Sequence, residues 1–309
     1  MTSHEPARPI VKWAGGKTKL LPILQRHLPS EIGTYVEPFA GGAALFFALA
    51  NEAATKHPTR TFRRAVLADK NEDLVACYRA VRDSVEELIE ALRKYRYDQD
   101  LFYEVRDRDS SKMSDVERGA RLIFLNRTCF NGLWRVNASG KFNVPFGRYK
   151  NPRILDEDGL RIASQRLAKV DVRLADFDEA TKGLRAGDFV YFDPPYVPVS
   201  KTADFTAYAE GGFGPKDQER LVATLRDLGK RGILAMLSNA DTEETQTLYE
   251  GFAVHQVEAP RSINSDASKR GNTTELLVLN WGMPGFHGIP GKSKRKAPAK
   301  AKAKAKKKP

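Results

Sequence analysis

The order of apolar segments constrains the fold of this chain more than any other feature of its sequence. Short apolar runs alternate with helical patterns from residue 9 to about residue 85, and the same alternation resumes after residue 168. Strands that alternate with helices form parallel sheets with crossover helices. The sequence therefore predicts one α/β domain from residues 9–85 and 169–282. Residues 86–168 are predicted to form an inserted, mainly helical domain that carries a hairpin.

Individual segments give this prediction its detail. Within the insertion, Leu88, Ile89 and Leu92 have helical spacing, whereas residues 131–149 are rich in Gly, Asn, Arg and aromatic residues, typical of a hairpin or an extended loop. Helices are expected at residues 43–54, 72–81, 122–125 and 217–228. Strands are expected at residues 35–37, 65–68, 170–174, 188–192 and 233–237, with an antiparallel finish at 254–257 and 275–279.

The net charge of +12 is concentrated at one end of the chain. Residues 291–309 contain ten Lys and Arg residues and no acidic one, so subtracting them from +12 leaves +2 for the rest. Residues 283–309 are mostly Lys, Ala, Pro and Gly and cannot bury enough surface to fold. They are predicted to form a disordered basic tail, and their charge is not counted toward a specific site.

Several other features narrow the class of protein. Cys77 and Cys129 offer neither a disulfide framework nor metal-ligand spacing, so two reduced thiols and no metal are expected. No apolar run reaches the roughly 18 residues that suggest a membrane span. Residues 1–9 lack the apolar core of a signal peptide. A cytoplasmic protein without a membrane partner is expected.

Asp193-Pro194-Pro195-Tyr196 directly follows the apolar segment 188–192. Ligands in open α/β sheets bind outside the carboxyl ends of the strands, where this tetrapeptide is expected to lie. The prolines remove two amide donors and leave carbonyl acceptors in a rigid turn. Asp193 and the Pro194 carbonyl can accept both N–H groups of an adenine amino group, and Tyr196 offers a ring on which a flipped base can stack. The alternative is a turn in which the aspartate merely caps a loop.

Three further segments fit a nucleoside ligand. Residues 37–42, Glu-Pro-Phe-Ala-Gly-Gly, follow a strand and precede a helix, which lets a ligand approach the backbone closely. The dinucleotide fingerprint G-x-G-x-x-G is absent, which disfavours NAD. Asp69 ends the next strand, where a carboxylate can accept hydrogen bonds from ribose hydroxyls or cap the following helix. Asp176 and Phe177 follow a third strand and could bind an adenine amino group and cover its ring.

Residues 12–18 do not match the phosphate-binding loop of a Walker A motif. Their sequence is Lys12-Trp13-Ala14-Gly15-Gly16-Lys17-Thr18. A Walker A motif needs glycine five positions before Gly16, where Val11 stands. A lysine and a tryptophan around a glycine turn suit a carboxylate and an apolar ligand face. A helix start punctuated by two glycines fits the composition equally well.

Residues 126–149 interleave aromatic side chains with Arg, Asn and Lys. This mixture suits base stacking, base-edge contacts and phosphate contacts at once. A polar surface hairpin with a few packed aromatics is the alternative interpretation. The density of Asn, Arg and aromatic residues favours nucleic-acid binding.

Taken in order, these segments resemble those of the Dam-like DNA adenine methyltransferases over residues 9–280. The matching segments are Lys-Trp-Ala-Gly-Gly-Lys (12–17), Val-Glu-Pro-Phe-Ala-Gly (36–41), Leu-Ala-Asp-Lys-Asn (67–71), Phe-Asn-Gly-Leu-Trp-Arg-Val-Asn (130–137), Phe-Asn-Val-Pro-Phe-Gly-Arg-Tyr (142–149), Asp-Pro-Pro-Tyr (193–196), Phe-Thr-Ala-Tyr (205–208) and Arg-Ser-Ile (261–263). The departures are Phe130 where relatives often carry Tyr, a lengthened link at 51–64 and the basic tail.

The resemblance implies a Rossmann-like S-adenosylmethionine methyltransferase sheet, with residues 86–168 as the target-recognition domain. It implies transfer of a methyl group from S-adenosylmethionine to the 6-amino group of adenine in duplex DNA, with GATC as the expected site. Asp193, Pro194, Pro195 and Tyr196 would be the catalytic residues. Cofactor contacts would come from Trp13, Lys17, Glu37, Phe39, Gly41, Asp69, Asp176, Phe177 and Asp193. DNA contacts would come from Phe130, Asn131, Leu133, Arg135, Asn137, Pro145 and Arg148.

We expect direct transfer to a flipped adenine without a covalent enzyme intermediate, by a monomer associated with the nucleoid. The loop 197–213 could close over the base. Restriction-modification, DNA replication and repair all remain open as biological settings. Two alternatives stay open for the activity itself. One is methylation of a planar amine on RNA or on a protein glutamine, and the other is a non-enzymatic DNA-binding protein that uses the basic tail.

Overall fold

A computed structural model of the protein describes residues 5–137, 139–196, 213–260 and 272–281. Three predicted features fall largely or wholly outside these residues. They are the closing loop 197–213, the Arg-Ser-Ile segment 261–263 and the basic tail 283–309.

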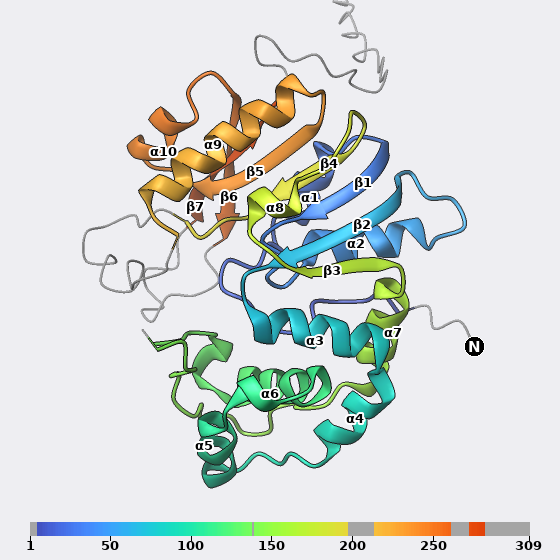
Figure 1. The fold of residues 1–309 in the computed structure, drawn as a ribbon, viewed down its shortest axis with the longest axis vertical. Helices are drawn as coiled ribbons and strands as arrows, with labels where there is room; N and C mark the ends of the chain where they lie inside the picture. Colours follow the sequence, from blue (N-terminus) through green and yellow to red (C-terminus); the bar gives the residue numbers. More distant parts are fainter. Residues whose placement is uncertain (1–4, 138, 197–212, 261–271, 282–309) are drawn as a thin grey trace, which may run out of the picture.

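Seven strands form a single sheet in the order β3-β2-β1-β4-β5-β7-β6 (Figure 1). The first five strands in the chain pair in parallel, and β7 joins β5 and β6 in antiparallel fashion. The predicted parallel sheet with an antiparallel finish is confirmed. The strands are β1 (Glu31–Glu37), β2 (Thr61–Asp69), β3 (Val170–Leu174), β4 (Phe189–Phe192), β5 (Leu234–Ala240), β6 (Ala253–Pro260) and β7 (Asn272–Leu279).

The strand order reverses between β1 and β4. From β1 the chain proceeds outward to β2 and β3, and then returns to β4 and β5 on the other side. Tyr35 pairs with Phe189 and Val36 with Val190, so the two strands end at the same edge of the sheet. In open α/β sheets, ligands bind at such a point of reversal, outside the carboxyl ends of the strands.

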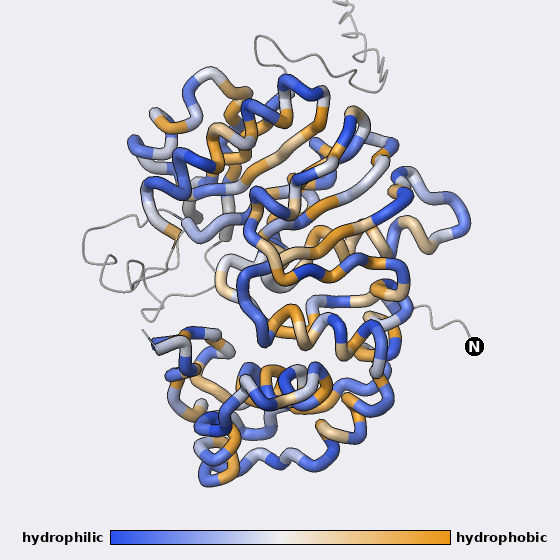
Figure 2. The backbone as a smooth tube through the Cα atoms, viewed as in Figure 1, coloured by the Kyte–Doolittle hydropathy of each residue, from blue (hydrophilic) through white to orange (hydrophobic). Residues whose placement is uncertain are grey.

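Helices cover both faces of the sheet, because side chains of successive strand residues point to opposite faces. Tyr35 contributes to one buried cluster and Val36 to the other. Helices α1 (Leu21–Arg26) and α2 (Ala44–Ala53) cover the first face. Helices α8 (Phe177–Ala180), α9 (Pro215–Lys230) and α10 (Glu243–Leu248) cover the second. Figure 2 shows hydrophobic residues along the middle of the strands and hydrophilic residues toward the outer surface.

Five α-helices lie between β2 and β3 in the chain, and Figure 1 shows α3 between the sheet and α6. Ile123 of α6 joins the cluster that covers the sheet, whereas its neighbour Phe124 packs with Phe102 in a separate cluster. The residues predicted as an insertion, 86–168, are mainly helical, and α6 connects the separate cluster to that of the sheet. The helices are α3 (Glu72–Asp83), α4 (Val85–Arg93), α5 (Gln99–Asp107), α6 (Asp115–Thr128) and α7 (Glu157–Leu167).

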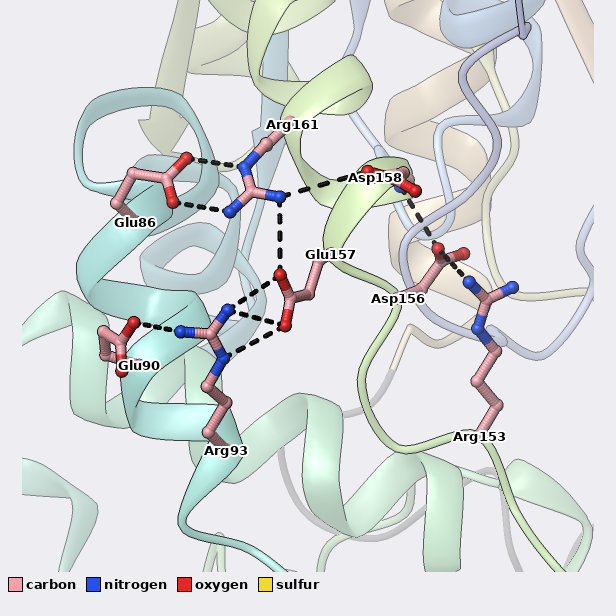
Figure 3. Close-up of polar contacts among 9 residues, drawn as sticks. Glu86, Glu90, Arg93, Arg153, Asp156, Glu157, Asp158 and Arg161 are labelled. Carbon is pink, nitrogen blue, oxygen red and sulfur yellow. Dashed lines mark hydrogen bonds and ion pairs between the residues drawn. The ribbon is translucent and has the colours of Figure 1, made fainter.

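An ion-pair network joins two helices of the insertion (Figure 3). Arg161 of α7 binds Glu86 of α4 at 2.8 Å, and Arg93 of α4 binds Glu157 of α7 at 2.8 Å. Arg93 also pairs with Glu90. Exposed ion pairs contribute little energy singly, so we assign this network a role in holding α4 and α7 in a fixed orientation.

Polar side chains cap the start of two helices, α3 and α6. Ser114 and Glu117 form a reciprocal capping box at the start of α6, in which the Ser114 amide donates to Glu117 Oε2 at 2.9 Å. Asn71 caps α3 by accepting the Leu74 amide at 2.9 Å. The alternative in which Asp69 caps this helix is therefore wrong, because Asn71 holds the capping position next to Glu72.

Candidate active site and nucleic-acid interface

Asp193 lies immediately after β4 and is paired with a buried lysine. Lys17 Nζ lies 2.7 Å from Asp193 Oδ1 and also donates to the Gly15 carbonyl at 2.5 Å. The side chain of Lys17 is 4 % exposed, and that of Asp193 is 20 % exposed. Burial raises the pKa of Asp193, and the Lys17 ammonium offsets part of that rise. The resulting carboxylate is oriented by a cation and still reaches the surface.

Two contacts fix the rest of the tetrapeptide. The Tyr196 hydroxyl donates to Glu275 Oε2 of β7 at 2.6 Å, and Gln218 of α9 donates to the Pro195 carbonyl at 3.3 Å. Lys17 Nζ lies 4.6 Å from the centroid of the Tyr196 ring. Glu275 and Gln218 were absent from the predicted site, because they lie 79 and 23 residues away in the sequence from their partners. No local motif marks either of them.

Gly41 follows β1 in a conformation that favours glycine, with φ +45°. A Cβ atom at this position would lie only 2.9 Å from Cδ1 of Trp13. The Tyr78 hydroxyl donates to the Gly41 carbonyl at 2.8 Å and helps to hold the turn. The structure thus brings the predicted residues Trp13 and Gly41 into contact at the carboxyl end of β1.

Asp69 ends β2 beside this glycine turn. Its Oδ2 accepts the Gly41 amide at 3.1 Å, and its Oδ1 accepts the Asn71 amide at 2.9 Å. Burial raises the pKa of Asp69, while these backbone hydrogen bonds act in the opposite direction. Each carboxylate oxygen has more than one acceptor direction, so Asp69 can still accept hydrogen bonds from a ligand hydroxyl.

Glu37 is almost completely buried at the end of β1, with 3 % of its surface exposed. Its Oε1 accepts the Tyr35 hydroxyl at 2.5 Å and the Phe46 amide, in the first turn of α2, at 2.7 Å. Burial raises the pKa of Glu37 to about 8. These contacts hold the start of α2 in place, and a direct contact of Glu37 with the cofactor stays a prediction.

Asp176 and Phe177 begin α8, at the end of β3. Lys70 and Arg220 bind the two Asp176 oxygens at 2.8 and 2.7 Å. Burial favours a higher pKa for Asp176, but hydrogen bonds from Lys70, the Asp178 amide and Arg220 outweigh it and lower the pKa. Phe39 stacks on the Phe177 ring with centroids 5.6 Å apart. Nothing in the motif Asp-Phe indicated the two basic partners.

The predicted DNA-reading residues lie on a hairpin that is anchored from within. Cys129 bridges to Phe146 and Val136 bridges to Phe142 in antiparallel fashion. The hairpin prediction is thereby confirmed, with isolated bridges in place of continuous strands. The buried side chains of Phe142 and Val144 join the core of the insertion, and the Tyr97 hydroxyl donates to the Gly147 carbonyl at 2.6 Å.

Most of the predicted reading side chains point outward from this hairpin. Leu133 is half-buried, whereas the other six are exposed: Phe130, Asn131, Arg135, Asn137, Pro145 and Arg148. The guanidinium Nε of Arg135 donates to Asn143 Oδ1 at 2.8 Å, which orients its terminal amino groups. Asn137 Oδ1 instead accepts the amides of Ser139 and Lys141 at 3.1 and 3.0 Å. Asn137 therefore shapes the hairpin tip.

Phe130 and Asn131 are presented by an unusual turn. Asn131 has φ +56° and Gly132 has φ +65°, so two consecutive residues adopt left-handed conformations. A non-glycine residue at positive φ is uncommon, although Asn tolerates it better than most. Phe130 is 51 % exposed despite its size. An exposed aromatic side chain on a strained turn fits contact with another molecule.

The residues that the structure describes contain no group of three or more His, Cys, Asp and Glu side chains that could hold a metal ion. In the same residues, no helix combines the length and the apolar character that crossing a membrane requires.

The sequence matches a known protein family over most of its length. Residues 13–263 match the family described as D12 class N6 adenine-specific DNA methyltransferase. The chain belongs to this family. It is 42 % identical over 283 residues to the type II methyltransferase M1.LlaDCHI of Lactococcus lactis subsp. cremoris, covering 89 % of this chain and 96 % of that one.

Two more proteins are similar to this chain over nearly their whole length. The type II methyltransferase M.MjaIII of Methanocaldococcus jannaschii is 41 % identical over 293 residues, covering 89 % of this chain and 99 % of that one. The DNA adenine methylase of Escherichia coli K12 is 33 % identical over 276 residues, covering 88 % and 95 %. The predicted Dam-like resemblance and the predicted class of enzyme, an adenine-specific DNA methyltransferase, are confirmed.

Proposed function

We propose that this D12-class enzyme transfers a methyl group from S-adenosylmethionine to the 6-amino group of a flipped adenine within a short duplex sequence. The observation that carries the proposal is the pairing of Asp193 with Lys17, 2.7 Å apart, beside the anchored ring of Tyr196. This arrangement provides an oriented acceptor for an amino group and a ring for a planar base.

The residues at the carboxyl ends of β1, β2 and β3 fit the proposed cofactor. At Gly41 a Cβ atom would collide with Trp13, so the missing side chain lets the Trp13 ring pack against the turn that follows β1. Asp69 can accept the ribose hydroxyls, and Asp176 with Phe177 can hold an adenine ring. When bound, S-adenosylmethionine supplies a methyl group activated by the positive charge on its sulfur.

Asp193 and the Pro194 carbonyl would accept the two N–H groups of the target amine and turn its lone pair toward that methyl group. A nitrogen–carbon bond forms while the carbon–sulfur bond breaks, and its electron pair stays on sulfur. The amine becomes acidic as it gains the methyl group, so its proton can leave through Asp193 to water. Catalysis comes largely from positioning and from oriented charges.

The Lys17 ammonium lies over one face of the Tyr196 ring, and we expect the base to stack on the other face. On the hairpin, Arg135 would donate to the edge of a guanine through its terminal amino groups, and Phe130 would enter or abut the opened base stack. The hairpin sequence favours GATC as the target. A monomer is expected to act on the nucleoid in the cytoplasm.

The test is methyl transfer to unmethylated duplex DNA, followed by mapping of every N6-methyladenine. One recurring sequence motif that contains the modified adenine is expected, and GATC is the proposed motif. Asp193→Ala should abolish this signal. Near-normal transfer by Asp193→Ala would overturn the mechanism, and transfer to RNA or protein glutamine instead of DNA would overturn the substrate.

The basic tail provides a second comparison. A chain truncated after Gly291 should bind DNA more weakly but still methylate the same motif. The logarithm of the DNA-binding constant falls linearly with the logarithm of salt concentration, and each phosphate that the tail neutralises should contribute about 0.9 to that slope. Truncation should therefore make the slope shallower. Complete loss of DNA binding on truncation would instead favour a protein that binds DNA through its tail alone.

A further inference from the structure

Asn126, near the end of α6, is a buried amide that joins two distant segments. It is 1 % exposed. Its Oδ1 accepts the Lys12 amide at 2.9 Å, and its Nδ2 donates to the Lys12 carbonyl at 2.8 Å and to the Gly132 carbonyl at 3.0 Å. Lys12 lies 114 residues from Asn126 in the sequence. One side chain thus connects the loop that contains Lys12 and Trp13, called the N-terminal loop below, to the turn that presents Phe130 and Asn131.

The two segments also meet directly. A Cβ atom on Gly132 would lie 2.7 Å from Cδ of Lys12, which shows how closely the turn approaches this loop. The Trp13 ring stacks on that of Trp134 in the hairpin, with centroids 6.1 Å apart and planes at 19°. Arg127, next to Asn126, donates to the Ile10 carbonyl at 2.8 Å.

On its other side, the N-terminal loop reaches the site proposed for the cofactor. Trp13 contacts the Gly41 position, and Lys17 binds Asp193. A continuous path therefore runs from Gly41 to Trp13, along the chain to Lys12, and through the hydrogen bonds of Asn126 to Gly132. Packed contacts and hydrogen bonds of this kind can carry a coupling free energy between two sites.

We propose that Asn126 is a positioning residue that couples cofactor binding to the reading of DNA, with the Trp13–Trp134 stack as a second contact of the same bridge. This inference rests on the proposed function. When the cofactor binds, it orders the N-terminal loop, and Asn126 transmits this order to the Phe130–Gly132 turn. When the duplex binds the turn, the N-terminal loop is stabilised in the same way. Coupling between two binding sites is reciprocal, so it can be measured from either side.

Asn51 provides a matched control, because it makes the same kind of contact elsewhere. Its Oδ1 accepts the Ala7 amide at 2.9 Å and its Nδ2 donates to the Ala7 carbonyl at 2.8 Å. It connects the N-terminal segment to α2 rather than to the hairpin. Replacing either Asn by Asp keeps the shape and one acceptor but removes the N–H donors and adds negative charge.

The experiment measures the affinity of the full-length protein for S-adenosylhomocysteine by calorimetry, with and without a short synthetic duplex. The duplex carries the sequence that the wild-type protein methylates. In the wild-type protein, the duplex should tighten binding by a factor of about 5 or more. In Asn126→Asp, this factor should fall below about 2, whereas Asn51→Asp should retain the wild-type factor.

Three outcomes would overturn the proposal: a factor near 1 in the wild-type protein, an unchanged factor in Asn126→Asp, or an equal loss in Asn51→Asp. If Asn126→Asp does not fold, Trp134→Leu, at a partly exposed position, replaces it. That variant should also reduce the factor, and an unchanged factor would contradict the bridge. Absence of adenine methylation by the wild-type protein would instead refute the proposed function, so the two failures are distinguishable.

Discussion

The carboxyl end of β4 and the hairpin at residues 129–149 are built in opposite ways. At the end of β4, the polar side chains already have protein partners: Asp193 binds Lys17, and Tyr196 binds Glu275. On the hairpin, the anchoring side chains point inward, while Phe130 and Arg135 are exposed. The first region is preorganised by the fold, whereas the second exposes the Phe130 ring and the Arg135 guanidinium, of which the Nε is held by Asn143.

This difference fits two separate tasks. A group that must face developing charge gains from being fixed before the reaction, because reorganisation would raise the barrier. A group that reads a base edge must be accessible, because the duplex supplies its hydrogen-bonding partner. Substitutions at the end of β4 should therefore affect turnover, and those on the hairpin should affect affinity and sequence preference.

The largest effect on turnover is expected for Asp193→Asn. The substitution keeps the shape but removes the negative charge and replaces one acceptor by a donor, so kcat should fall by about 10²–10³-fold, as for loss of one preorganised polar group. Single-turnover methylation measures it. Asp188→Asn, at the opposite end of β4, is the control and should retain transfer. A comparable fall in kcat in both variants would show that the effect is not specific to the carboxyl end of β4.

Glu37→Gln tests the buried side of the same region. The folded chain holds the Glu37 proton more tightly, with a pKa of about 8 against an ordinary value of 4.5. Stabilisation from this proton is complete below about pH 4.5 and is lost as pH rises to about 8. At about 1.4 kcal/mol per pKa unit, the wild-type protein should lose up to roughly 5 kcal/mol across that range relative to Glu37→Gln. Denaturant unfolding of both proteins at several pH values measures this loss. An unfolding free energy that changes equally with pH in the two proteins would contradict the prediction.

On the hairpin, Arg135→Ala should weaken specific DNA binding by about 1–3 kcal/mol and relax the preference at one base pair. The maximal rate at saturating DNA should change much less. Competition binding with every substitution of the methylated sequence measures the effect. Arg153→Ala removes an exposed arginine that pairs with Asp156 outside the hairpin, so it should leave the sequence preference intact. A uniform loss for all sequences would assign Arg135 to phosphate contacts.

The smallest effect is expected for Tyr196→Phe, which keeps the ring but removes the hydrogen bond to Glu275. Loss of one such bond should cost about 1–2 kcal/mol, and it should lower kcat without changing the sequence preference. Tyr191→Phe removes a comparable hydrogen bond to Ser238, 2.8 Å away, and serves as the control. If Tyr196→Phe altered the sequence preference, the end of β4 and the hairpin would not have the separate tasks described above.

Much of the fold could be predicted because its signals are local. The segment 170–174 is β3 as predicted, and 72–81 lies within α3. The strand predicted at 35–37 begins earlier, at Glu31. The prediction missed residues 31–34 because Glu-Ile-Gly-Thr is not a continuous apolar run. Short helices such as α8 and α10 were not predicted, since four to six residues give too little periodicity.

The sequence by itself determined the residue types of the proposed site and the order of its motifs. Asp193-Pro194-Pro195-Tyr196 holds its acceptors and ring within four adjacent residues, so no distant part of the chain is needed to recognise them. Only the tertiary structure decided which residues support them. Glu275 reaches Tyr196, and Asn126 joins Lys12 to Gly132, because the strand order and the packing of α6 bring distant segments together. A hydrogen bond requires atoms within about 3 Å, and sequence separations of 79 and 114 residues carry no information about that distance.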